Sequence, residues 1–213
     1  MKTVLAFGDS LTWGADPQTG LRHPRQFRWP EVLRAELVGL AEVISEGLGG
    51  RTTCYDDHTG PACRNGARAL EVALASHMPI ELVIIMLGTN DLKPVHGGRA
   101  EAAASGMRRL AEIVETFPYK PRYARPKLML VAPPPCLAGS EGQTAGGRSV
   151  IESERLAPLY HKLAAELGHA FFDAGTVARA SEIDGVHLDV ANTAAIGRAL
   201  AGPVADILRA APL

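Results

Sequence analysis

The sequence lacks several features that would assign it to specialised classes of protein. No apolar run approaches the ~20 residues that a helix needs to cross a bilayer. The formal net charge is only −1, with 22 Lys and Arg against 23 Asp and Glu, which argues against a basic surface for nucleic acid or membrane. Met1-Lys2 leads directly into an apolar segment, which leaves no room for a cleavable signal. We therefore expect a cytoplasmic protein that binds neither nucleic acid nor membrane.

Cysteine is also scarce. The three residues Cys54, Cys63 and Cys136 are an odd number, and the first two lie far apart with His58 between them. A zinc site would need closer C-x₂₋₄-C spacing and a fourth ligand. We interpret all three as reduced thiols, and we predict neither a metal nor an organic cofactor.

The chain does contain alternating strand and helix patterns. Apolar segments typical of strands lie at 3–7, 41–46, 82–87, 127–132 and 170–173. Helical patterns lie between and after them, at 29–37, 65–77, 99–116, 150–167 and 190–210. The segment 82–87 is apolar at every position, which is typical of a strand buried on both faces of a parallel sheet. This order predicts an α/β fold, a flavodoxin-like three-layer α/β/α sandwich with a five-stranded parallel sheet, in a single domain at 1–213.

Four short polar segments follow these predicted strands. They are Gly8-Asp9-Ser10, Gly49-Gly50-Arg51-Thr52-Thr53, Gly88-Thr89-Asn90-Asp91 and, before the last helix, Asp184-Gly185-Val186-His187. Right-handed crossovers place the loops after parallel strands at one edge of the sheet, where open α/β sheets bind their ligands. We therefore expect the four segments to meet there.

The residue types in these segments suit nucleophilic catalysis. A serine hydroxyl such as that of Ser10 is a poor nucleophile unless a base removes its proton. His187 is a candidate base, and Asp184 can fold back in a tight turn to orient its imidazole. Gly185 between them eases that turn. The motif differs from the G-x-S-x-G elbow, because Thr12 stands where its second glycine would be.

Together, the four segments resemble the four sequence blocks of the SGNH, or GDSL-type, hydrolase family, in the same order from Gly8 to His187. The resemblance implies the SGNH hydrolase fold and a catalytic triad of Ser10, His187 and Asp184. It also implies an oxyanion hole formed by the backbone N–H groups of Ser10 and Gly50 and by the side-chain amide of Asn90.

Two assignments keep an alternative at this point. Gly50 has Gly47 and Gly49 close by, and an ordinary turn glycine explains it equally well. Trp13, just after the nucleophile, is a candidate wall of the acyl pocket or an ordinary core residue. Lys93, just past Asn90, is a candidate substrate-binding residue at the rim of the pocket.

Within the family, the stretches G-D-S-L-T-W-G, E-G-L-x-x-R-T-T and I-I-M-L-G-T-N-D-x-K are most similar to bacterial arylesterase/acyltransferases. This resemblance implies a homo-oligomer that acts on a small-molecule ester with a short acyl chain, and it makes acetylated carbohydrates a candidate substrate class. We therefore predict a serine esterase that works through an acyl-enzyme.

Other functions remain open at the level of sequence. An acyltransferase or perhydrolase would use the same triad and pass the acyl group to an alcohol or peroxide. A lysophospholipase or thioesterase would need a longer apolar groove. A non-catalytic module could bind anions at helix N-termini, but it would have no use for a histidine oriented by a carboxylate. The glycine-rich segment 138–147 is either a lid or an oligomer contact.

Overall fold

The computed structural model describes residues 1–210 and contains a sheet of five parallel strands in the order β2-β1-β3-β4-β5. The strands are β1 Lys2–Gly8, β2 Ala41–Gly47, β3 Leu82–Met86, β4 Lys127–Ala132 and β5 Ala170–Asp173. This strand order is that of flavodoxin-like sheets, and it reverses between β1 and β3. The predicted fold class is confirmed.

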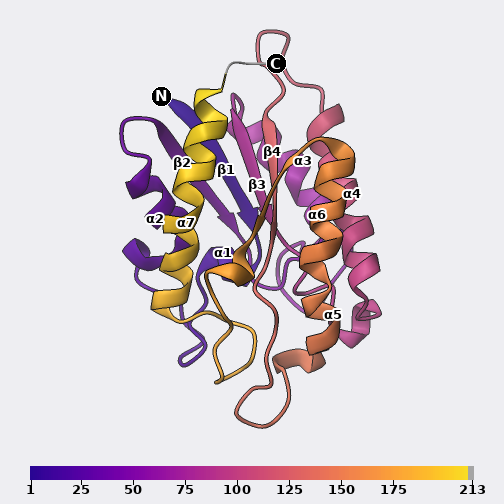
Figure 1. Ribbon diagram of the computed structural model, residues 1–213. Coiled ribbons are helices and arrows are strands. Elements are labelled where there is room, and N and C mark those ends of the chain that lie inside the picture. The colour runs from indigo at the N-terminus through magenta and orange to yellow at the C-terminus, as the bar shows by residue number, and fades with distance from the viewer. Residues whose placement is uncertain (211–213) are drawn as a thin grey trace.

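Helices cover both faces of the sheet (Figure 1). They are α1 Ser10–Trp13, α2 Trp29–Glu36, α3 Gly66–His77, α4 Ala100–Thr116, α5 Val150–Glu154, α6 Leu156–Leu167 and α7 Val190–Arg209. Short 3₁₀ turns are η1 Arg25–Phe27, η2 Pro94–His96, η3 Ala145–Gly147 and η4 Ala174–Thr176. Helices α2 and α7 pack together on one face, and α3, α4 and α6 pack on the other. Within residues 1–210, no helix combines the length and the apolar character that a membrane span requires.

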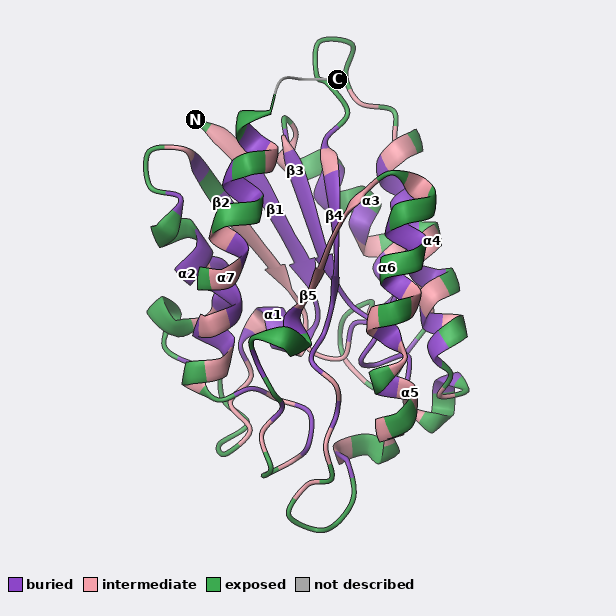
Figure 2. Cartoon of the chain, in the orientation of Figure 1, coloured by how far each residue is buried: buried purple, intermediate pink, exposed green. Residues whose placement is uncertain are grey.

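Successive side chains of β1 point to opposite faces of the sheet and so belong to two separate layers of the core. Leu5 and Phe7 pack with the α3, α4 and α6 side, whereas Val4 and Ala6 pack with the α2 and α7 side. Every residue of β3 is buried, as Figure 2 shows for the centre of the sheet, because helices cover this central strand on both faces.

The register of the central strands aligns their carboxyl ends. Gly8 of β1 pairs with Gly47 of β2 and with Met86 of β3. The loops after β1, β2 and β3 therefore leave the sheet at the same level, next to the point where the strand order reverses. Ligands of open α/β sheets bind at such a point.

The helix predicted at 150–167 is two helices, α5 and α6, which are separated at Arg155. Pro158 has no N–H to donate to the carbonyl of Glu154, so a continuous helix would lose a hydrogen bond there. The chain instead restarts a helix with Pro158 in its first turn, where the N–H is not needed.

Candidate active site

Ser10 is held in a tight strand-to-helix turn at the end of β1. It begins the short helix α1, and Asp9 caps this helix by accepting a hydrogen bond from the N–H of Leu11 at 2.9 Å. A Cβ at Gly8 would lie 2.0 Å from Thr12 Oγ1, so only glycine allows α1 to fold back this closely on β1. The turn leaves Ser10 half-buried at the edge where the loops gather.

The histidine and the carboxylate predicted as its partner lie in line with Ser10. His187 Nε2 is 3.0 Å from Ser10 Oγ, and His187 Nδ1 is 2.5 Å from Asp184 Oδ2. The other oxygen, Asp184 Oδ1, accepts the N–H groups of Val186 and His187, both at 2.9 Å. Partial burial works to raise the pKa of Asp184, but these hydrogen bonds outweigh it and hold that pKa below its usual value. The carboxylate is thus ionised and fixed beside the imidazole.

Asn90 lies buried in the loop after β3, at the same edge. Its Nδ2 donates to the carbonyl of Arg51 at 3.0 Å and to Asp9 Oδ2 at 3.2 Å, and its Oδ1 accepts from Arg148 Nη2 at 2.7 Å. Arginine has donors only, and both neighbours of Nδ2 are acceptors. The orientation of the amide is therefore fixed from both sides.

Gly50 follows β2 in a left-handed conformation, with φ of +81°. A Cβ there would lie 2.7 Å from Arg64 Nε, so the glycine permits both this backbone and the close approach of Arg64. Gly47, in contrast, packs against the backbone of Trp13, and Gly49 faces open space. Among residues 1–210, the N–H groups of Ser10 and Gly50 have no hydrogen-bond partner.

A buried carboxylate ties the loops after β2 and β3 together. Both oxygens of Asp91 accept the N–H of Thr53, and Oδ1 also receives the Thr53 hydroxyl. Burial raises the pKa of Asp91 to about 7. Burial also raises the pKa of Asp9, against the opposing effects of the Leu11 N–H and of the nearby charge on Arg148. Asp9 thus contacts the amide of Asn90 directly, and Asp91 fixes the loop that carries Asn90.

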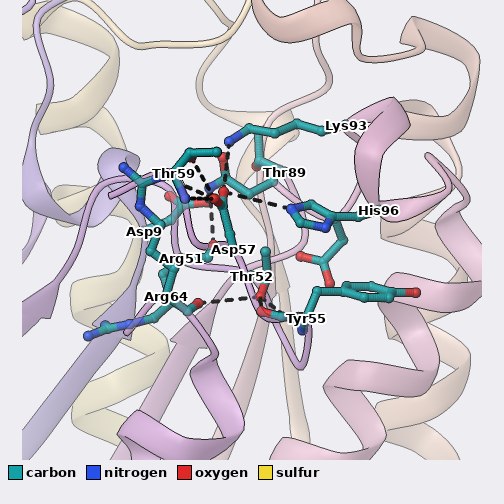
Figure 3. A network of polar contacts seen from close by, with 12 residues as sticks. Asp9, Arg51, Thr52, Tyr55, Asp57, Thr59, Arg64, Thr89, Lys93 and His96 are labelled. Atoms are coloured by element: carbon teal, nitrogen blue, oxygen red, sulfur yellow. Dashed lines mark hydrogen bonds and ion pairs between the residues drawn. The ribbon is translucent and has the colours of Figure 1, made fainter. Parts of the chain in front are cut away.

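Lys93 belongs to a polar cluster centred on Asp57 (Figure 3). Its Nζ lies 3.6 Å from Asp57 Oδ2, and Arg64 Nη1 lies 3.4 Å from Asp57 Oδ1. Hydrogen bonds from Thr59, with the charges of Arg64 and Lys93, hold the pKa of Asp57 well below its usual range. Lys93 is therefore half-buried in an ion pair, and its contact with a substrate stays a prediction.

Trp13 is not a core residue. Its ring is half-buried, and the guanidinium of Arg22 lies 5.2 Å from the ring centroid, while Arg22 Nε donates to the carbonyl of Trp13 at 2.7 Å. The core-packing alternative is thus wrong, and a role as a wall of the acyl pocket stays a prediction.

Arg148 and the segment that precedes it contact the site, although the sequence did not predict a role for them. The N–H of Ala145 donates to the carbonyl of Asp184 at 2.8 Å, and the N–H of Leu137 donates to the carbonyl of Gly185 at 2.8 Å. Arg148, just beyond, contacts Asn90. This loop is therefore attached to both sides of the site, which argues against a lid that opens freely. No motif marks Arg148, so the sequence offered no signal for it.

The described residues offer no obvious place for a metal ion. Across residues 1–210, no three His, Cys, Asp or Glu side chains are grouped so as to hold one, and all three cysteines are free.

Comparison with known families matches residues 6–192 to a model of the GDSL-like Lipase/Acylhydrolase family. This span begins in β1 and ends in α7, so it includes every proposed catalytic and oxyanion-hole residue. Comparison with curated proteins gave no match.

Similar solved structures include three proteins with esterase descriptions. A protein of Agrobacterium tumefaciens str. C58, provisionally assigned as an arylesterase, is 78% identical with a TM-score of 0.96, covering 97% of this chain and 100% of that one. A carbohydrate acetylesterase family member from Sinorhizobium meliloti is 47% identical with a TM-score of 0.93, covering 98% and 99%. The native M. smegmatis aryl esterase is 40% identical with a TM-score of 0.89, covering 97% and 100%. The similarity thus extends over nearly the full length of each protein.

Proposed function

Since this chain belongs to the GDSL-like lipase/acylhydrolase family and is a carboxylic ester hydrolase, we propose that it cleaves short-chain acyl esters through an acyl-enzyme on Ser10. The observation that carries the proposal is the continuous line of hydrogen bonds from Asp184 through His187 to Ser10, at 2.5 and 3.0 Å. Nucleophile, base and orienting group lie within the reach that such catalysis requires.

In the first step, Ser10 Oγ attacks the carbonyl carbon of the ester while His187 Nε2 takes its proton. General-base catalysis of this kind contributes about 10²–10⁴ in rate. Asp184 accepts a hydrogen bond from the Nδ1–H of His187. It stabilises the imidazolium that forms, without itself taking the proton. The lowered pKa of Asp184 keeps it ionised for this task at neutral pH.

The tetrahedral intermediate carries a negative oxygen, which needs donors that are already in place. The N–H groups of Ser10 and Gly50, which lack partners among residues 1–210, and Nδ2 of Asn90 supply them in this proposal. The Asn90 amide already donates to Asp9 at 3.2 Å, the longer of its two bonds, and we expect the oxyanion to compete for this proton. Removing one donor of this kind costs about 10²–10³ in turnover.

Collapse of the intermediate releases the alcohol, which takes the proton from His187 and leaves the acyl group on Ser10. Water then attacks the acyl carbon while His187 takes its proton. The bond to Ser10 Oγ breaks, Oγ receives that proton from His187, and the carboxylic acid leaves. An alcohol or peroxide in place of water would give acyl transfer or perhydrolysis with the same residues.

The proposed substrates are aryl or alkyl esters with short acyl chains, including acetylated carbohydrates. The aryl esterase and the carbohydrate acetylesterase family member to which this chain is similar support these classes. A non-catalytic binding module is disfavoured, because anion binding has no use for a histidine held between a carboxylate and a serine hydroxyl.

The test is hydrolysis of p-nitrophenyl acetate, butyrate and octanoate by the wild type and Ser10→Ala, with and without added alcohol. We expect activity that falls with acyl length and drops by at least about 10³-fold in Ser10→Ala. Ser105→Ala, at an exposed serine of α4, is the matched control and should retain wild-type rates. Ester product in the presence of alcohol would favour the transferase alternative. Equal activity in the wild type and Ser10→Ala would overturn the proposal.

A further inference from the structure

We infer that Arg148 is a positioning residue of the oxyanion hole, and that its guanidinium both holds and polarises the amide of Asn90. The inference rests on the proposed function, since it assigns Arg148 a role in stabilising the charge that forms during attack by Ser10. It makes a residue outside the four sequence blocks a determinant of the rate.

All three nitrogens of the Arg148 guanidinium donate hydrogen bonds to residues near or at Asn90. Nε donates to the carbonyl of Thr89 at 2.8 Å, and Nη2 donates to Asn90 Oδ1 at 2.7 Å. Nη1 donates to the carbonyl of Ala145. Two consecutive residues of the loop after β3, one through its backbone and one through its side chain, are thus held by one rigid planar group.

The charge on Arg148 acts on the far side of the same amide. A cation hydrogen-bonded to Oδ1 withdraws electron density from Nδ2, which strengthens its N–H groups as donors. The site is partly shielded from water, so a fixed charge here interacts more strongly with a developing oxyanion than it would in solution. Arginine is charged throughout the working pH range, so the effect needs no titration.

The backbone that carries Arg148 is anchored independently of its side chain. The N–H of Ala145 donates to the carbonyl of Asp184 at 2.8 Å, and Thr144 Oγ1 donates to the carbonyl of Leu137 at 2.9 Å. Ser149, the next residue, caps α5 by accepting the N–H of Glu152 at 3.2 Å. Truncating Arg148 therefore leaves these anchors in place and removes its contacts to the Asn90 amide and to the carbonyls of Thr89 and Ala145.

The first measurement is steady-state hydrolysis of p-nitrophenyl acetate by Arg148→Met. We expect kcat to fall about 10- to 100-fold, less than the loss of the donor itself, with KM within about threefold of the wild type. We expect kcat to fall without a matching change in KM, because the amide of Asn90 meets a negative charge only as the transition state forms. Arg148→Lys should recover part of kcat, since it restores the charge without the planar group.

A double-mutant cycle separates this role from general support of the fold. In an Asn90→Ala background, we expect Arg148→Met to lower kcat by less than about threefold, because the group it acts on is gone. Arg155→Met is the matched control, because this arginine pairs with Glu152 and Glu101 on the surface. It should retain the wild-type kcat and KM.

A wild-type kcat in Arg148→Met, or an equal loss of kcat with and without Asn90, would overturn the inference. Melting temperatures identify any variant that fails to fold, and Arg148→Lys and Arg148→Gln then carry the same cycle. Full activity in Ser10→Ala would reject the proposed function and this inference together. Inactivity of Ser10→Ala with fully active Arg148 variants would reject this inference alone.

Discussion

Gly185 shows how one residue fixes the geometry of the proposed triad. It lies between Asp184 and His187 with φ of +73°, in the left-handed region. Its carbonyl accepts the N–H of Leu137 at 2.8 Å, and a Cβ at Gly185 would lie 2.0 Å from the carbonyl oxygen of Leu137. Glycine is required here for two reasons: the left-handed backbone conformation and the close approach of the loop that contains Leu137.

We expect Gly185→Ala to displace the Asp184–His187 turn, lowering kcat/KM for p-nitrophenyl acetate by about 10²-fold, as ångström-scale misplacement does. The matched control is Gly39→Ala, with φ of +79° but open space around the added methyl group. The control bears only the left-handed backbone cost of about 1–2 kcal/mol in unfolding free energy and should keep its kcat/KM. Thermal denaturation and kinetics on both variants check this, and equal activity losses would contradict it.

The residues of the site differ in how visible they are in the sequence. Ser10 and Asn90 lie in short polar segments that follow predicted strands, and Asp184 and His187 lie in one before the last helix. The four segments together resemble the SGNH sequence blocks, and this resemblance implied the roles of these residues. Arg148 has no such context. Its contact with Asn90 joins positions 58 apart in the chain, and it follows a segment whose composition specifies no structure. Only the folded chain reveals that contact.

At the scale of elements, buried carboxyl groups join the loops that form the site. Asp91 binds Thr53 across the loops after β3 and β2, and Asp9 accepts from Asn90. Neither carboxyl is exposed, so each holds its proton more tightly in the folded chain than in the unfolded one. These links make the stability of the loops depend on pH.

For Asp91, the folded pKa of about 7 lies above the ordinary value of 3.8. The folded state therefore binds more protons than the unfolded state, and the contribution of Asp91 to stability is fully present below about pH 4 and is lost as the pH rises through 7. Between pH 4.5 and 8, we expect the unfolding free energy of the wild type to decrease relative to that of Asp91→Asn, which does not titrate at this position.

Urea unfolding across this pH range measures the slope. Asp206→Asn, at an exposed position of α7, is the control and should follow the wild type. Parallel curves for Asp91→Asn and the wild type would show that Asp91 does not titrate as expected.

The elements that were predicted and those that were missed differ in length and periodicity. Each of the five strands was located within a residue or two of its ends. Most of them contain a continuous apolar run, which is a strong signal, whereas 41–46 mixes apolar with charged residues. The helix α1 was missed, since four residues show no helical periodicity. The break at Arg155 was missed because the apolar pattern continues across it, although Pro158 favours a new first turn.

At the scale of the whole molecule, exposed apolar side chains mark a candidate contact between copies of the chain. Val95 on η2 is 77% exposed and Ile151 on α5 is 69% exposed. The two elements lie near each other, since Pro94 of η2 approaches Gly147 shortly before α5, and Glu152 of α5 accepts the N–H of Ala100 at the start of α4, shortly after η2. Figure 2 shows α5 as a mixture of exposed and more buried residues beside the loops of the site. A net charge of only −1 provides little repulsion between copies.

We expect the wild type to form a homo-oligomer in solution, as the resemblance to arylesterase/acyltransferases implies, and to use Val95 and Ile151 in its contacts. The double variant Val95→Asp with Ile151→Asp would place two carboxylates in that contact and should shift the mass towards a single chain, because an unpaired buried charge is strongly unfavourable. The control is Val38→Asp, 84% exposed just before β2, at the opposite edge of the sheet from the site. Light scattering after size exclusion measures each mass. A monomeric wild type would refute the oligomer, and an oligomeric double variant would place the contact on another surface.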